Sequence, residues 1–181
     1  MNIELEKFLA NARATNLNES SLEDLRKVRT ECSSVETDVS FVRRVSQGRL
    51  DIVGHEVNQR STDSHSKLDV SDLLFDLPEI LRDETIKGGG MRRVGVDGPG
   101  PMANVLGTEL DTLVSPNELS SIDSQDENRL LEVFNALQDF ESDLSIARRT
   151  LHEVIDNIQQ EIGRRYKHGE ASIANLLSPK S

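Results

Sequence analysis

The sequence has few of the residues that build large cores or covalent cross-links. Among its 181 residues there is one cysteine, one tyrosine and no tryptophan, and aromatic residues make up only 3%. The single Cys32 excludes an internal disulfide and a cysteine-based zinc site, so we expect a reducing, cytoplasmic location. The hydrophobic share of 35% is low for a compact domain. It favours long helices that share a narrow apolar seam.

Long apolar runs and a basic balance are also missing. No window approaches the roughly 18 apolar residues of a membrane span, and the N-terminus lacks the pattern of a signal peptide. The net charge of −11 argues against direct nucleic-acid binding and suits a partner with a basic surface. No set of Ser, His, Asp or Cys is typical of catalysis, and the histidines lack metal-ligand spacing. We therefore expect neither an enzyme nor a metal site.

Two long helices, at residues 21–60 and 125–168, dominate the hydrophobic pattern. Apolar or small residues recur in both at alternating spacings of three and four, which is a heptad seam. The first seam consists of Leu25, Val28, Cys32, Val35, Val39, Val42, Ser46 and Val53, and it weakens beyond Val42, where it includes Gly48, Arg49 and Glu56. The second consists of Leu130, Val133, Leu137, Phe140, Leu144, Ala147, Leu151, Val154 and Ile158. Because two such seams can bury each other, the predicted fold class is all-α. We expect an antiparallel two-helix coiled-coil hairpin with one or more shorter helices and a flexible Gly-rich middle segment.

The predicted domain organisation has three parts. They are an N-terminal extension at 1–20, a helical coiled-coil domain at 21–168 and a C-terminal tail at 169–181. The linker at 61–124 joins the long helices and is expected to hold short helices of its own. Shorter helical or apolar segments are predicted at residues 3–14, 69–82, 102–114 and 173–177, with a Gly-rich loop at 88–100. Asn18 or Ser20 is expected to cap the first long helix, and Ser124 the second.

Each long helix contains one copy of a polar repeat. The segments ETDVSFVRRVSQGRLD and ESDLSIARRTLHEVID share the pattern E-x3-S-x2-R-x3-(Q/H)-x3-D, and the arginine that follows the patterned one is also shared. The copies are Glu36, Ser40, Arg43, Gln47 and Asp51, and Glu141, Ser145, Arg148, His152 and Asp156. Each copy falls within about 80° of one helix face and spans roughly 22 Å. Antiparallel pairing relates the two stripes by a pseudo-two-fold axis, which matches a ligand with two-fold symmetry.

The residue types of the repeat suit a guanine nucleotide. Arginine pairs with guanine O6 and N7 or with phosphate. Carboxylates accept from the N1–H and N2–H₂ edge of guanine, a donor pattern that adenine lacks, while Ser and Gln bond phosphate or sugar oxygens. The alternative is a solvated coiled-coil flank in which these charges form salt bridges. Two in-phase copies favour the ligand.

The doubled pattern resembles the cyclic di-GMP-binding signature of the RsiG family of actinobacterial anti-sigma factors. The first copy matches at all five positions, and the second departs at His152, where the family has Gln. The segment IDNIQQEIGRRYKHGEASIANLL is also similar to that family's C-terminal region. The resemblance implies that both helices hold a dimer of cyclic di-GMP, two molecules per chain. It also implies that the loaded protein binds a flagellar or sporulation-type (WhiG-like) sigma factor and keeps it from core polymerase.

The resemblance implies that all ten repeat residues contact the ligand. We assign the arginines to guanine or phosphate, the four carboxylates to guanine edges, and the remaining side chains to further contacts. His152 either weakens one half-site, strengthens binding at lower pH as it becomes cationic, or is a tolerated replacement. Because both copies lie in one chain, a monomer is sufficient. Two alternatives stay open: a structural coiled-coil adaptor without ligand, and a cyclic di-GMP effector whose partner is not a sigma factor.

Overall fold

The structure is a computed structural model in which residues 2–63 and 99–167 are described. The regular elements in these residues are all helical, which confirms the predicted fold class. In chain order they are α1 (Ile3–Arg13), α2 (Leu22–Asp63), α5 (Pro101–Leu113), α6 (Pro116–Ser120), the 3₁₀ helix η1 (Ile122–Ser124) and α7 (Glu127–Lys167). The predicted segments at 69–82 and 173–177, and most of the Gly-rich loop, lie outside the described residues.

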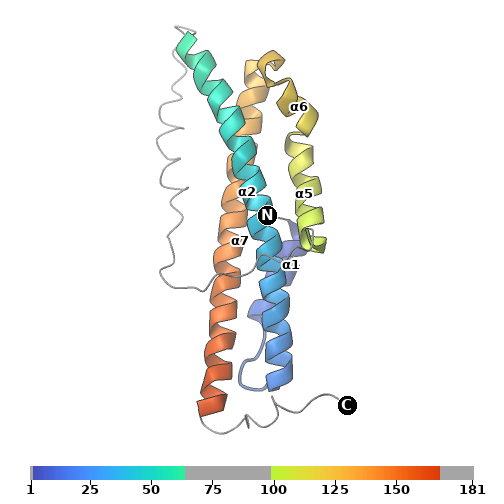
Figure 1. Ribbon diagram of the computed structural model, residues 1–181, viewed down its shortest axis with the longest axis vertical. Coiled ribbons are helices and arrows are strands. Elements are labelled where there is room, and N and C mark those ends of the chain that lie inside the picture. Colours follow the sequence, from blue (N-terminus) through green and yellow to red (C-terminus); the bar gives the residue numbers. More distant parts are fainter. Residues whose placement is uncertain (1, 64–98, 168–181) are drawn as a thin grey trace.

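Helices α2 and α7 run side by side in opposite directions along the long axis of the molecule (Figure 1). All nine predicted seam residues of α7 are buried. On α2, the residues that occupy the first position of each predicted heptad are fully buried: Leu25, Cys32, Val39, Ser46 and Val53. The antiparallel hairpin predicted from the two heptad patterns is therefore the framework of the fold.

The seam of α2 departs from the prediction in its second half. Gly48 is exposed and lies outside the seam, while Leu50 and Val57 are buried in it. A straight helix repeats every 3.6 residues and drifts against a strict 3.5-residue pattern. Ser46 and Val53 stay buried as predicted, but the residue buried next to each of them is the one four positions on, Leu50 or Val57, and not the one three positions on. Arg49 therefore lies at the edge of the seam, where its guanidinium group bonds the C-terminal end of α5.

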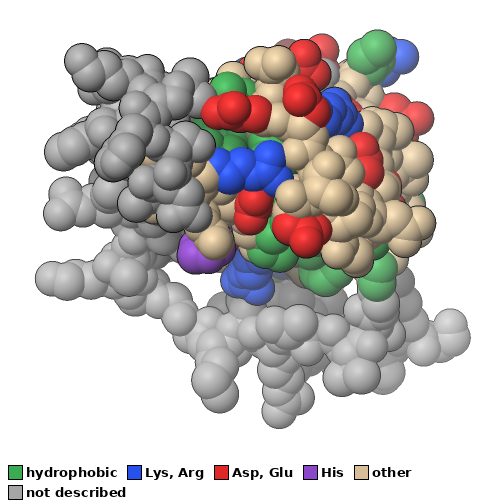
Figure 2. All heavy atoms as spheres, turned by 90° about the horizontal axis from the view of Figure 1, so that it is seen from above, with side chains coloured by type: hydrophobic (Ala, Val, Ile, Leu, Met, Phe, Trp, Pro, Cys, Tyr) green, Lys and Arg blue, Asp and Glu red, His purple; other side chains and the backbone are tan. Residues whose placement is uncertain are grey.

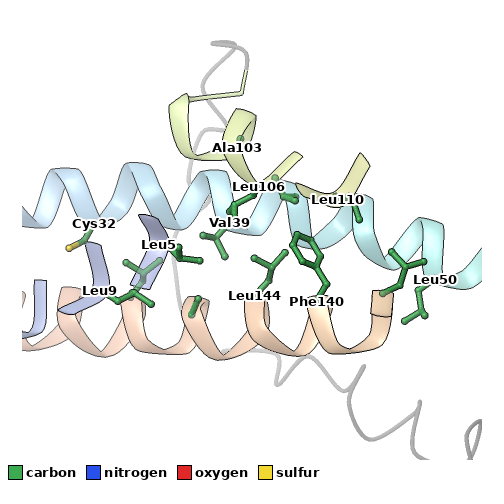
Figure 3. Close-up of a cluster of buried hydrophobic side chains, with 14 of the residues drawn as sticks. Leu5, Leu9, Cys32, Val39, Leu50, Ala103, Leu106, Leu110, Phe140 and Leu144 are labelled. Carbon is green, nitrogen blue, oxygen red and sulfur yellow. The ribbon is translucent and has the colours of Figure 1, made fainter. Parts of the chain in front are cut away.

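Helices α1 and α5 add a second layer to the hairpin. Helix α5 packs against α2 and α7, and α1 packs against α7. The Asn2 amide, at the start of α1, donates to the Glu109 carboxylate of α5 at 2.6 Å. Figure 3 shows the side chains that α1 and α5 bring into the core beside those of α2 and α7: Leu5, Leu9, Ala103, Leu106 and Leu110. This layer explains why α7 buries more apolar residues than a two-helix seam requires.

Helix α5 is held at both ends by side chains of α2. At its N-terminus, the Asp38 carboxylate accepts hydrogen bonds from the backbone N–H groups of Gly100, Met102 and Ala103, at 3.0–3.2 Å. At its C-terminus, Arg49 donates to the carbonyls of Leu110 and Val114. An anion at the N-terminus and a cation at the C-terminus both complement the helix dipole. A Cβ at position 100 would lie 2.6 Å from an Asp38 oxygen, so glycine permits the close approach.

The helix starts differ from those expected. Ser21 caps α2, because its Oγ accepts from the Asp24 N–H at 3.1 Å, so the prediction of Asn18 or Ser20 is wrong by one residue or more. Asp126 precedes α7 and accepts from the Asn128 N–H, whereas Ser124 lies in η1. A carboxylate two residues closer to the first helical turn displaces the serine as the cap. The short α6 has a complete capping box in which Ser115 and Glu118 bond each other's backbone N–H groups.

Two arginine side chains, of the half-buried Arg60 and the buried Arg165, hold the loops at the two ends of the hairpin. Near the end of α2, Arg60 donates to the carbonyls of Ile122, Asp123 and Gln125. Near the end of α7, Arg165 donates to the carbonyls of the turn between α1 and α2, at residues 17, 18 and 20. The polar groups of the connecting turns are thus satisfied by the long helices themselves.

Figure 2 shows the molecule end-on, and in this view acidic side chains surround a few Lys or Arg side chains.

Candidate functional site

The two polar stripes lie on one flank of the α2–α7 seam, and α1 and α5 lie on the other. At about 100° per residue, Asp38 and Arg49, which hold α5, are on the far side of the seam from the stripe of α2. Thr150 has the corresponding place on α7, where it accepts a hydrogen bond from Arg13 of α1. These contacts attach α1 and α5 on the side of the seam away from the stripes. The repeat therefore occupies the flank that the small helices leave open.

The first half of the site is centred on Glu141. Its Oε1 accepts hydrogen bonds from Arg43 Nη1 at 3.0 Å and from Gln47 Nε2 at 3.1 Å, both on the opposite helix. It also accepts from Ser145 Oγ on its own helix at 3.0 Å. The Glu141 side chain is 1% exposed. Four repeat residues from the two helices thus meet at one buried carboxylate.

The second half repeats this arrangement with the helices exchanged. Glu36 accepts from Ser40 Oγ on its own helix at 2.8 Å. From the opposite helix, Arg148 Nε lies 3.5 Å from Glu36 Oε1, and His152 Nε2 lies 3.3 Å from the same oxygen. Every member of one cluster corresponds to a member of the other 105 positions along the chain. The pseudo-two-fold relation expected from the repeat is present in the side-chain contacts.

The two halves of the site differ in the exposure of their arginines and in the hydrogen bonds of Gln47 and His152. The Arg43 side chain is 10% exposed, whereas the Arg148 side chain is 27% exposed. Gln47 donates a hydrogen bond where His152 makes none through its buried Nε2 among the described residues. An imidazole protonated on both nitrogens would form an ion pair with Glu36 at that position. The replacement of Gln by His is therefore accommodated in a more open half-site.

The two aspartates of the repeat are not brought together. Asp51 and Asp156 are exposed. In the antiparallel register fixed by the crossed contacts, the two lie at opposite ends of the stripe, roughly 30 Å apart along the axis at 1.5 Å per residue. Eight of the ten predicted residues form the two central clusters. The aspartates mark the outer limits of the site.

The crossed contacts give the glutamates a role that we did not predict from the sequence. The assignment of Glu36 and Glu141 to guanine edges stays a prediction, and in this structure each glutamate also bonds or pairs with an arginine of the opposite helix. A buried carboxylate is stable only when its charge and lone pairs are satisfied in this way. The signal was available, because two in-phase copies in an antiparallel pair place each Glu beside the other copy's Arg. The glutamates hold the arginines in fixed positions.

Other kinds of site find no support in the described residues. No group of three or more His, Cys, Asp or Glu side chains there is placed to hold a metal ion. Cys32 is buried in the seam, and burial, with the nearby Glu31 charge, raises the pKa of its thiol. Over residues 2–63 and 99–167, we also find no helix with the length and apolarity that a membrane span requires. The repeat clusters are thus the polar feature that calls for an explanation.

Comparison with known proteins identifies the family. The model of the RsiG-like family matches residues 11–81 and 116–179, which include both long helices and both copies of the repeat. No curated protein shows a significant match to the sequence. The family match covers well over half of the chain and contains all ten residues of the two stripes. The chain therefore belongs to the RsiG-like family.

Proposed function

We propose that the chain is a cyclic di-GMP-binding anti-sigma factor, whose ligand occupies the repeat flank of the α2–α7 pair. The observation that supports this proposal most strongly is the crossed pair of clusters around Glu36 and Glu141. Two equivalent half-sites, related by a pseudo-two-fold axis, suit a ligand that is itself two-fold symmetric. The flank is also the one that α1 and α5 leave open to a ligand. Family membership agrees with this function.

The exposure of each side chain indicates its role toward the ligand. Asp51 and Asp156 are exposed, and their carboxylates accept from the N1–H and N2–H₂ groups of guanine. Ser40, Ser145 and Gln47 are half-buried and bond phosphate or sugar oxygens beside them. The arginines supply planar donors for phosphate or the guanine edge. Glu36 and Glu141 position those arginines.

The length of the site supports two ligand molecules per chain. The aspartates at its ends lie roughly 30 Å apart along the axis, farther than one cyclic dinucleotide extends. Each half-site holds its own arginine, amide or imidazole, and aspartate, so each half takes one molecule. The two molecules meet near Ser40 and Ser145, at the centre of the pseudo-two-fold arrangement.

The partner of the loaded form is a WhiG-like sigma factor, which is thereby kept from core polymerase. The net charge of −11 is complementary to the basic, DNA-facing surfaces of sigma factors. A ligand that bridges α2 and α7 fixes their relative position and becomes part of the surface presented to the partner. By mass action, the messenger then favours the sigma-bound state.

The test combines calorimetric titration with co-elution on a sizing column. We expect Asp51→Asn/Asp156→Asn to lose at least about tenfold in cyclic di-GMP affinity, because two guanine-edge acceptors lose their charge. Arg43→Ala/Arg148→Ala should abolish binding. Glu31→Gln/Asp139→Asn is the matched control, since it removes two exposed charges from the same helices away from the stripe. A WhiG-like sigma factor should co-elute with the unmodified chain only when cyclic di-GMP is present.

A second candidate, a coiled-coil adaptor without ligand, draws on the same contacts. The Arg43–Glu141 and Arg148–Glu36 pairs satisfy each other in the ligand-free protein, as structural ion pairs do. Under that function, the titration gives no heat with cyclic di-GMP, with or without sigma factor, from a folded helical sample. Guanine-selective binding without sigma capture would instead indicate an effector with a different partner.

A further inference from the structure

One pair of arginines stands apart from all others in the described residues. Twelve arginines lie in residues 2–63 and 99–167, and ten of them contact an acceptor or an aromatic ring. The other two are Arg44 and Arg149, which are exposed and contact no acceptor there. They occupy equivalent positions in the two copies of the repeat. Ten of the twelve arginines in the described ranges thus bond other groups of the protein, and this symmetric pair does not.

Both arginines adjoin the proposed ligand site. Arg44 lies four residues after Ser40 and three before Gln47, and Arg149 has the same spacing from Ser145 and His152. Side chains three or four residues apart on a helix are neighbours, with Cβ atoms about 5–6 Å apart. The register places the two arginines roughly 10–12 Å apart along the axis, one in each half of the site. They therefore form the outer edge of the stripe, next to its half-buried polar groups.

The charge of the proposed site requires additional cations. Its ten residues contain two arginines and four carboxylates, which gives a net charge of −2 with His152 neutral. Cyclic di-GMP is an anion with two phosphodiester groups, and the whole chain is also negative. Such a ligand is repelled by a site of its own sign unless nearby cations offset the repulsion. Arg44 and Arg149 bring the charge of the set to zero.

We propose that Arg44 and Arg149 are a second arginine pair of the ligand site, each binding phosphodiester oxygens of the cyclic di-GMP in its own half. This inference rests on the proposed function and adds two binding residues to it. The inner arginines, Arg43 and Arg148, are held by glutamates, whereas the outer pair is fixed only when the ligand arrives. Long, exposed guanidinium groups also attract the anion before it docks, so they raise the rate of association.

The test is calorimetric titration of the full chain with cyclic di-GMP at low and high salt. We expect Arg44→Ala/Arg149→Ala to bind at least about tenfold more weakly than the unmodified chain and to show a flatter salt dependence. Arg44→Lys/Arg149→Lys keeps the charges and should recover part of the loss. Lys27→Ala/Lys167→Ala is the matched control, because it removes two exposed charges from the far ends of the same helices. It should change the affinity by no more than about twofold, as screened distant charges do.

The outcomes separate this inference from the function on which it rests. If the unmodified chain binds no cyclic di-GMP, both are overturned. If Asp51→Asn/Asp156→Asn weakens binding but the outer arginine variant keeps full affinity and salt dependence, only this inference fails. The same holds if the outer variant binds ligand normally and loses only the sigma factor, since the arginines would then belong to the partner interface. Circular dichroism checks that each variant retains its helices.

Discussion

The two flanks of the α2–α7 pair use the same kinds of polar side chain in different ways. On the covered flank, Asp38 and Arg49 are committed to the ends of α5. On the repeat flank, Arg43 and Glu141 are committed to each other across the helices. One flank is closed by short helices with apolar faces, and the other presents polar groups in a fixed arrangement. Polar residues beside the seam thus either attach a neighbouring helix or form the candidate ligand site. The groups that they bond show which of these two roles each residue has.

The comparison also shows where stability and function are separable. Capping residues on the covered flank stabilise the fold without facing the stripes. The buried crossed pairs on the repeat flank contribute to both, because they join the helices and position the arginines. The exposed residues of the repeat flank contribute little to the fold. Substitutions on the two flanks should therefore change the unfolding free energy and the ligand affinity to different extents.

The largest effect on stability is expected from Glu141→Ala. It leaves the guanidinium of Arg43, which is 8% exposed, without its buried counter-charge, and should lower the unfolding free energy by about 3 kcal/mol. Urea denaturation of both single variants and the double variant Arg43→Ala/Glu141→Ala measures the coupling, which should be at least about 1 kcal/mol. The corresponding cycle for Glu36 and Arg148 should give a smaller value because that pair is more open. Equal coupling in the two cycles would show that the halves do not differ as described.

On the covered flank, Asp38→Ala should lower the unfolding free energy by about 2 kcal/mol. The change leaves three backbone N–H groups at the start of α5 without their acceptor. Thermal or urea unfolding gives the stability, and calorimetry should find the cyclic di-GMP affinity nearly unchanged. An affinity that falls in parallel with stability would contradict the separation of the two flanks.

Within the seam between the flanks, Ser46→Ala should stabilise the protein by about 1 kcal/mol. The Ser46 side chain is fully buried, and its hydroxyl has no hydrogen-bond partner among the described residues. Removing it eliminates an unsatisfied polar group and introduces the residue with the highest helix propensity. Urea denaturation provides the measurement. Destabilisation instead would mean that the hydroxyl is bonded in solution.

The smallest effect is expected in the last turns of α7, beyond the end of the second copy of the repeat. Hydrogen bonds from Arg164 and Arg165 lower the pKa of Glu161 to about 2, against 4.5 for the unperturbed side chain. The folded protein therefore binds fewer protons at this group than the unfolded chain does. Its contribution to stability is present above about pH 4.5 and is lost as the pH falls toward 2. Unfolding of Glu161→Gln measured across this range should be less dependent on pH than that of the unmodified chain.

The sequence was sufficient for the parts of the molecule that follow a regular repeat. Heptad spacing located both long helices and the buried positions of α7, because burial of one stripe dictates that spacing. It also located the repeat whose members meet around Glu36 and Glu141. The sequence did not reveal the hydrogen bonds by which Asp38 and Arg49 hold the two ends of α5, since those contacts depend on how a distant segment folds back. The drift to Leu50 and Val57 was missed because the heptad template is only an approximation to a straight helix.

The most direct test of the pseudo-two-fold ligand site is the stoichiometry of cyclic di-GMP binding. Calorimetric titration of the full chain, with GTP and cyclic di-AMP as controls, should give selective binding of two molecules per chain. Each half-site around Glu36 and Glu141 then takes one. A folded helical sample that binds no cyclic di-GMP, either alone or with a WhiG-like sigma factor, would contradict the site. So would saturation at one molecule per chain, since two equivalent halves predict two.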